Sequence, residues 1–239
     1  MKNKLKIPSE IVYIIAMFLI SFAVAITTGA NLGLSMIVAP AYIISKMLPV
    51  LTFGQCEYIV QTVLFIILCI VVKKVKLVYF SSYITGLICG FLLDMFLLLI
   101  PSFNNSANFN IFVRILFFII GSVLTALAIA LLYKTYFYPQ VYDFFVKIIA
   151  SCKNLNLIKF KRIYDGCMFG LSAILALLYY LFFEKALVGI NIGTIILTFI
   201  TGPLIGVFLK LIDKFTIITP LFPKFARYFS FDDISEKSI

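Results

Sequence analysis

Long, uncharged apolar segments dominate the chain and determine its class. Three of them, Ile11–Thr28, Ile115–Tyr133 and Gly166–Phe183, are 18, 19 and 18 residues long and contain no charged residue. A fourth, Ala186–Leu209, adds 24 residues. A helix needs about 20 apolar residues to cross the hydrocarbon of a bilayer. These segments are too long and too uniformly apolar for the strands of a membrane barrel, so the pattern predicts an all-α membrane protein.

Eight apolar segments can be distinguished, of which two are short. Leu34–Val50 and Tyr136–Ala150 each carry proline and at least one charged residue, which suits re-entrant or interfacial helices better than complete crossings. We therefore predict a polytopic transmembrane helical bundle with about six crossings and two short helices. The expected crossings are Ile11–Thr28, Gln55–Val72, Val78–Ile100, Ile111–Tyr133, Ile163–Phe183 and Ala186–Leu209.

The distribution of positive charge favours six crossings over eight. With both termini in the cytoplasm, six crossings place 17 of the 20 Lys and Arg residues on the cytoplasmic side, and eight crossings place 15 there. Cytoplasmic loops of membrane proteins collect Lys and Arg. The net charge of +10 is therefore explained by topology. The lipid bilayer is the predicted partner, and no nucleic acid is predicted to bind.

The order of the segments is repeated along the chain. Each half reads long segment, short proline-bearing segment, long segment, long segment, with Pro40 and Pro139 in matching places. Three crossings per half would invert the second half, as in many transporters. The alternative is chance similarity between apolar helices. The predicted transmembrane domain covers residues 1–219, with repeats at about 10–100 and 111–212, and a cytoplasmic tail covers 220–239.

Asp94 is the polar residue that stands out, because it lies inside the expected crossing Val78–Ile100 and is followed by six apolar residues. A carboxylate at the bilayer centre costs about 2.5–3.5 kcal/mol on insertion scales and tends to be paired or functional. Asp94 is expected either to hold a proton, cation or substrate, or to form a structural ion pair with Lys46. Nearby glycines and the polar break after the first crossing complete the candidate substrate or ion site, with a packing seam and a plain surface loop as the alternatives. The candidate residues are Asp94, Asn31, Gly29, Gly33, Gly90 and Gly202.

Further charged residues near the ends of the segments form two sets. The cytoplasmic set includes Asp143 and Lys147, which are four residues apart and can pair on one helical face. The opposite set includes Glu57. Such sets suit the gates of a transporter closed by ion pairs, and they equally suit caps that hold short helices in place. The candidate gate or ion-pair residues are Lys46, Glu57, Lys134, Asp143, Lys147 and Asp165.

Residue types that support most enzymatic chemistry are missing or scattered. The chain has no histidine, and its five cysteines form no C-x-x-C pair. Histidine is the commonest general base and the commonest ligand of catalytic zinc, and no glycine-rich nucleotide loop is present. We therefore predict no enzyme activity, no metal site and no cofactor.

Several motifs carry a family resemblance over roughly residues 10 to 215. Leu32-Gly-Leu-Ser-Met-Ile-Val-Ala-Pro-Ala-Tyr42 is followed by Leu51-Thr-Phe-Gly-Gln-Cys-Glu-Tyr58, and Tyr136-x-x-Pro139-x-x-Tyr142-Asp143-x-Phe145-x-Lys147 lies in the second half. With Gly193-Thr194 and Gly202-Pro203, these segments resemble an uncharacterised branch of the YczE/YyaS/YitT-like group of bacterial membrane proteins. Ser35-Met36-Ile37 stands where other members carry a Ser-Pro-Trp-like turn, so details from those members do not transfer. The resemblance implies a bacterial inner-membrane protein without an assigned substrate.

Three functions are compatible with these features. The first is a transporter or permease for an unknown small solute, coupled to an ion. The second is the substrate-capture subunit of an ATP-driven importer, which would need a partner membrane complex. The third is a non-transporting scaffold that assists membrane-protein assembly. The sequence is also compatible with a homo-oligomer.

Overall fold

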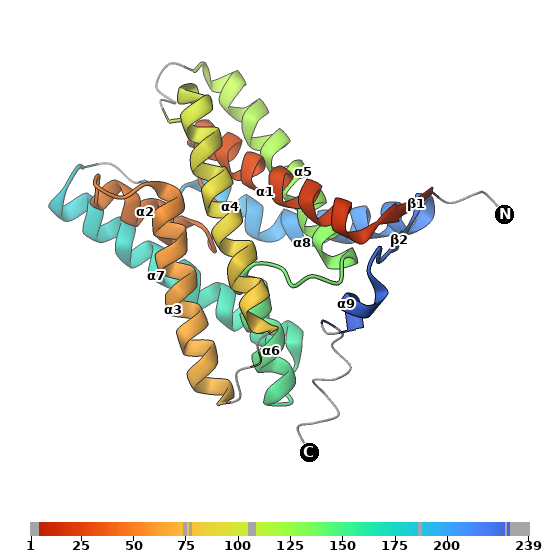
Figure 1. Cartoon of the computed structure of the whole chain (residues 1–239). Coiled ribbons are helices and arrows are strands. Elements are labelled where there is room, and N and C mark those ends of the chain that lie inside the picture. The colour runs from red at the N-terminus through yellow and green to blue at the C-terminus, as the bar shows by residue number, and fades with distance from the viewer. Residues whose placement is uncertain are drawn as a thin grey trace.

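The computed structural model of the protein describes residues 5–73, 76, 78–104, 109–185, 188–227 and 229. Most of the predicted C-terminal tail lies outside these residues. The elements, shown in Figure 1, are β1 (Leu5–Pro8), α1 (Ser9–Ala30), α2 (Ala39–Met47), α3 (Phe53–Val72), α4 (Tyr79–Leu99), the 3₁₀ helix η1 (Pro101–Phe103), α5 (Ile111–Lys134), α6 (Val141–Cys152), α7 (Leu157–Phe182), α8 (Ile192–Phe215), β2 (Thr216–Thr219) and α9 (Pro223–Arg227).

Six of these helices, α1, α3, α4, α5, α7 and α8, are long and apolar enough to cross a membrane. The two segments predicted to be short form α2, of 9 residues, and α6, of 12 residues. The prediction of a polytopic helical bundle with six long apolar helices and two short ones is therefore confirmed.

The ends of the last two crossings differ from the prediction. Helix α7 begins at Leu157 rather than at Ile163, and α8 begins at Ile192 rather than at Ala186. The start of α8 is fixed by the Asn191 side chain, which accepts a hydrogen bond from the Ile192 amide at 2.9 Å. Hydropathy locates the part of a helix that lies in lipid, whereas caps and turns decide where the helix itself begins.

A two-stranded parallel sheet joins the ends of the bundle and was not predicted. Leu5 of β1 pairs with Thr216 of β2, and Pro8 pairs with Thr219. Immediately after β1, the carboxylate of Glu10 accepts hydrogen bonds from the Leu221 amide and from the Tyr136 hydroxyl. The start of α1 and the end of α8 therefore lie side by side (Figure 1), which agrees with an even number of crossings because both ends are then on the same side of the membrane.

The two short helices occupy equivalent places between the same two long helices. Helix α2 packs against α3 and α7, and α6 also packs against α3 and α7. Chain connectivity places α2 after the first crossing and α6 after the fourth, so they lie at opposite ends of the bundle. Among the long helices, α1 packs against α4 and α5, α3 against α4, and α5 against α8.

The irregular backbone before α2 is satisfied by donors from the bundle. Asn31 ends α1 in the left-handed conformation, with φ 48°. Arg114 of α5 donates from Nε to the Ala30 carbonyl at 2.8 Å and from Nη2 to the Asn31 carbonyl at 2.6 Å. The Leu34 amide donates to the Gly189 carbonyl at 3.0 Å. Such partners are necessary because the hydrocarbon offers no water to an open backbone.

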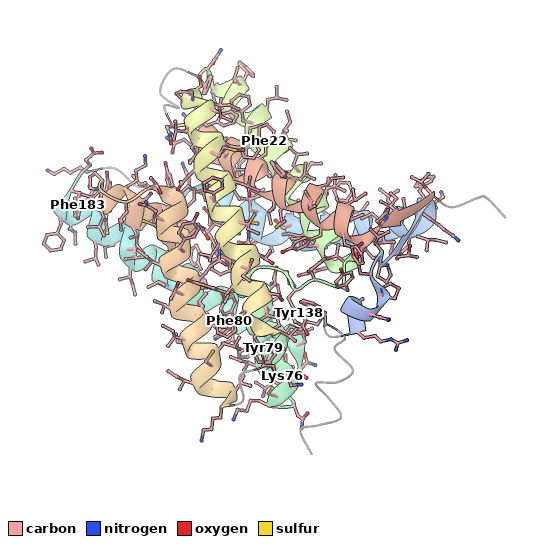
Figure 2. The ribbon with its side chains drawn as sticks, in the orientation of Figure 1. Phe22, Lys76, Tyr79, Phe80, Tyr138 and Phe183 are labelled. Atoms are coloured by element: carbon pink, nitrogen blue, oxygen red, sulfur yellow. The ribbon has the colours of Figure 1, made fainter. Side chains whose placement is uncertain are left out.

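The irregular backbone before α6 is satisfied by hydroxyl groups of α4. Ser82 donates to the Pro139 carbonyl at 2.6 Å, and Thr85 donates to the Tyr138 carbonyl at 3.1 Å. Tyr79 and Tyr138, labelled in Figure 2, both pack against Phe144 of α6, at ring distances of 5.2 and 4.7 Å. Most of α6 is buried, which favours a re-entrant helix over an interfacial one.

Helices α3 and α4 approach so closely at Gly54 that a Cβ atom there would overlap the Gly90 carbonyl oxygen and the Asp94 carboxylate. Because backbone would have to move, we expect Gly54→Ala to lower the free energy of unfolding by about 1–3 kcal/mol. The matched control is Gly170→Ala in α7, where a Cβ meets nothing within 4 Å and alanine favours the helix by up to about 1 kcal/mol. Thermal unfolding in detergent measures both, and equal midpoints would contradict the close approach.

Candidate functional site

A cavity of about 290 Å³ lies inside the bundle. All six long helices contribute to its wall, as do α6 and the segment between α1 and α2. The irregular segments before α2 and before α6 meet here, since Met36 from the first and Gln140 from the second both line the cavity. One polar or small residue from each long helix illustrates the arrangement: Ser21, Glu57, Gly90, Thr125, Asp165 and Thr201.

Glu57 is the most buried charged residue of this wall, with an exposed fraction of 5%. Its Oε2 atom accepts hydrogen bonds from Tyr142 Oη at 2.7 Å and from Gln61 Nε2 at 3.2 Å. Its Oε1 atom is buried and has no hydrogen-bond partner in the described structure. No Lys or Arg of the described residues forms a salt bridge with Glu57. Ionised, this carboxylate would be a buried charge without a counter-ion, which is costly.

Local structure explains how Glu57 and its partners are positioned. Thr52 caps α3, because its hydroxyl accepts from the Gln55 amide at 3.2 Å while the Gln55 side chain accepts from the Thr52 amide at 3.0 Å. Glu57 follows in the next turn, and Gln61 lies four residues later on the same face. Gly86 of α4 leaves room for Gln61, since a Cβ there would overlap Oε1 of the amide.

Tyr142 enters the site from the first turn of α6. A tyrosine hydroxyl with its ordinary pKa of about 10 is protonated at neutral pH, so Tyr142 is the donor in its hydrogen bond to the Glu57 carboxylate.

A second polar group lies at the same cavity. Lys161 Nζ of α7 forms an ion pair with Asp143 Oδ1 of α6 at 3.1 Å, and Tyr133 of α5 lies against Asp143. Asp165 is one turn after Lys161, and its Oδ1 atom is buried without a hydrogen-bond partner in the described residues. Glu57, Asp143 and Asp165, predicted at opposite faces, thus line one cavity.

The structure gives the other charged candidates different neighbours from those considered in the sequence. Asp143 pairs with Lys161 and not with Lys147, which is not among the residues that line the cavity. Lys134 pairs with Asp213 of α8 at 2.6 Å. Lys46 lies over the Tyr42 ring, with Nζ 5.3 Å from its centroid.

Asp94 lies outside the cavity and fixes the start of α3. Its Oδ2 atom accepts from the Thr52 hydroxyl at 2.5 Å, and its Oδ1 atom accepts from the Gly54 amide at 2.7 Å. Lys46, proposed as its partner, does not contact it in an ion pair. The carboxylate at a helix N-terminus is favourable because free amide groups and the helix dipole attract negative charge.

The small and polar candidates fall into two groups. Gly90 and Gly202 line the cavity. Asn31 and Gly33 line a separate hollow of about 10 Å³ at the first break, and Gly29 packs against Phe103, where an added Cβ would lie 2.9 Å from Cδ1. Only the first group belongs to the site built around Glu57.

Four residues that shape the site or its support are absent from the candidates predicted from the sequence: Gln61, Tyr142, Lys161 and Arg114. Gln61 and Lys161 each lie four residues from a carboxylate on the same helix, a spacing that places them on one face. This spacing was a usable signal. Nothing in the local sequence links Arg114 to the carbonyl groups of the first break.

The site can accept a proton or hold a group that donates hydrogen bonds. Its wall brings together three carboxylates, one lysine and several hydroxyl groups. Among the described residues, no three His, Cys, Asp or Glu side chains gather as metal ligands would.

Six long apolar helices around a cavity that contains carboxylates define a polytopic helical membrane protein. Residues 7–210 match DUF6198, a family of unknown function, and the chain belongs to that family. No curated protein and no solved structure matches the chain.

Asp94 and Thr52 offer a test of the link between α4 and α3. Hydrogen bonds to charged groups contribute about 1.5–3 kcal/mol, so we expect Asp94→Asn to lower the unfolding free energy by about 1–3 kcal/mol. In a double-mutant cycle with Thr52→Val, measured by thermal unfolding in detergent, the two effects should couple by about 0.5–3 kcal/mol. Glu184→Gln, at an exposed carboxylate, is the control. Additive effects would show that the bond contributes nothing.

Proposed function

We propose that this protein transports a small solute across a bacterial inner membrane, and that protonation or cation binding at Glu57 couples the movement to an ion gradient. One observation carries the proposal. A cavity lined by all six long helices contains a buried carboxylate that has two neutral hydrogen-bond donors and, among the described residues, no cationic partner.

The coupling follows from the electrostatics of burial. In a low-dielectric interior an unpaired carboxylate is strongly disfavoured, so Glu57 needs a proton or a cation. Gaining or losing that positive charge changes the charge of the cavity by one unit. A solute that prefers one of the two charge states then binds in step with the ion, which is the differential affinity that coupling requires.

The packing of the two halves supports an inverted repeat. Helix α1 packs against α4 as α5 packs against α8, and α2 packs against α7 as α6 packs against α3. Exchanging α1–α4 for α5–α8 therefore reproduces most of the helix–helix contacts in the bundle. Binding sites at the interface of inverted repeats are common in secondary transporters.

The pair α3 and α4 departs most clearly from this symmetry, and the difference supports two alternating states. Helices α3 and α4 pack closely, but within the described helices α7 and α8 show no comparable packing. Gly166 and Gly170 of α7, with Gly202 and Gly206 of α8, have open space where a Cβ would stand. In the alternative state, α7 and α8 would close along these glycines while α3 and α4 separate.

The remaining features of the proposal rest on the sequence. The YczE/YyaS/YitT-like resemblance supports a bacterial inner-membrane location, and the distribution of Lys and Arg supports cytoplasmic termini. We propose a non-enzymatic role, since the cavity has no histidine with which to perform general base chemistry.

Glu57→Gln tests the coupling, because glutamine keeps the size of the side chain and an acceptor for Tyr142 but cannot ionise. We expect uptake driven by a pH gradient into proteoliposomes to fall at least about ten-fold. The solutes tested are a labelled amine, a labelled carboxylate and a labelled neutral compound, which together form the panel. The control is Glu184→Gln, at an exposed carboxylate, which should transport like the unaltered protein. Transport of none of the panel, or full transport by Glu57→Gln, would overturn the proposal.

Substitutions at Gly206 test whether α7 and α8 close against each other in the alternative state. A Cβ atom at Gly206 would meet nothing within 4 Å in this conformation, whereas a leucine side chain there would block the approach of α7 to α8. We expect Gly206→Leu to reduce uptake at least about ten-fold without lowering the thermal unfolding midpoint, and Gly206→Ala to retain most of it. Equal uptake by both variants would contradict closure at this position.

A further inference from the structure

We infer that the solute bound in this cavity is a small organic cation, a primary amine in its ammonium form with a short apolar group, and that Glu57 binds the ammonium. The inference deepens the proposed function and rests on it for transport. The substrate class itself follows from the chemistry of the cavity wall.

Five aliphatic hydroxyl groups of the wall already act as hydrogen-bond donors. Each of the five donates to a main-chain carbonyl, four of them within their own helix and one to α4, at distances of 2.6 to 2.9 Å. Their oxygen atoms still have free lone pairs. The cavity therefore offers acceptors from these groups and few donors. The residues are Ser21, Thr27, Thr125, Thr198 and Thr201.

The charged groups point to the same class of ligand. The wall contains three carboxylates, Glu57, Asp143 and Asp165, and one ammonium, Lys161. With all four ionised the sum is −3 + 1, or −2. Asp143 holds Lys161 at 3.1 Å, so the lysine is already paired. An anionic solute would meet uncompensated negative charge, whereas a cation would reduce it.

Buried oxygen atoms without donors provide an independent observation. Glu57 Oε1, Gln61 Oε1 and Asp165 Oδ1 are buried and have no hydrogen-bond partner in the described structure. Buried acceptors normally have a partner. Gln61 Nε2 donates to Glu57 Oε2 at 3.2 Å, and Gln61 Oε1 lies against Gly86 of α4. Glu57 Oε1 and Asp165 Oδ1 are therefore the unpartnered oxygens that belong to carboxylates of the cavity wall. An ammonium group supplies three N–H donors and no acceptor.

The volume of the cavity and its aliphatic lining fit an organic solute better than a bare ion. A volume of about 290 Å³ is close to the lower end of the range of about 300–1,000 Å³ that is typical of small-molecule sites. Aliphatic side chains, among them Ile20, Val24, Leu93, Ile129 and Ile205, line the same space. They fit the hydrocarbon portion of a solute, while the carboxylates fit its charged end.

Equilibrium binding of labelled n-butylammonium to the full-length protein in detergent tests the inference. Three competitors separate the contributions: tetramethylammonium carries the charge without N–H donors, butan-1-ol carries the apolar chain without charge, and butyrate carries the opposite charge. We expect n-butylammonium to bind, and tetramethylammonium and butan-1-ol to compete at least about ten-fold more weakly than unlabelled n-butylammonium. Butyrate should not compete.

Variants then assign the ammonium site. Glu57→Gln should weaken n-butylammonium binding at least about ten-fold, and Glu184→Gln should leave it unchanged. The competition series uses the unaltered protein, so it decides the matter even if Glu57→Gln fails to fold. Binding of butyrate as tight as that of n-butylammonium, no binding of n-butylammonium, or unchanged binding by folded Glu57→Gln would overturn the inference.

The outcomes separate this inference from the proposed function. If n-butylammonium binds but proteoliposomes move no member of the panel, the transport proposal fails and the amine site stands. If proteoliposomes move butyrate or the neutral solute while n-butylammonium does not bind, transport stands and the amine site fails.

Discussion

The whole arrangement depends on one constraint, the need to give every main-chain carbonyl and amide a partner where no water is available. The irregular segments before α2 and before α6 interrupt the helical hydrogen bonding, so their main-chain groups need other partners. Arg114 satisfies the first break with a pair of guanidinium hydrogen bonds, and Ser82 and Thr85 satisfy the second with hydroxyl groups. These donors come from long helices, so each break is stable only in the assembled bundle.

The breaks in turn create the cavity. A continuous helix has no reason to leave polar atoms at the centre of a bundle, but a short helix that begins inside the bundle places its first turn there. Tyr142 reaches Glu57 in this way, from α6 to α3. Because α2 and α6 each bridge α3 and α7, the same two long helices carry both short elements and the carboxylates Glu57 and Asp165. The helices that hold α2 and α6 in place are therefore the same ones that carry two carboxylates of the cavity.

The sequence specified the six long helices well, because the hydropathy of a segment reports directly on its solvent. It specified the site less well. Asp94 stood out because of its depth in an apolar segment, yet its oxygens are used to cap α3. Glu57 was less conspicuous near the start of a crossing, and its burial depends on helix α6, which lies far along the chain.

Ion pairs show the same limit. The spacing of Asp143 and Lys147 is local and visible in the sequence, but the structure pairs Asp143 with Lys161, 18 residues away. Helical periodicity lists the residues that share a face of one helix, whereas the choice of partner depends on how helices pack. The strands β1 and β2, of four residues each, were missed because they are too short to show a period.

The pairing of those two strands has a consequence for biosynthesis. Leu5–Pro8 emerges from the ribosome before the six long helices, but its partner Thr216–Thr219 emerges only after all six have been made. The amino-terminal strand must therefore wait, with its hydrogen-bonding groups in contact with water, while the membrane segments are inserted one after another. Closing so large a loop is among the slowest kinds of contact to form. The sheet can therefore form only at the end of folding, after the six long helices have been synthesised and inserted. Its formation joins the two ends of the bundle.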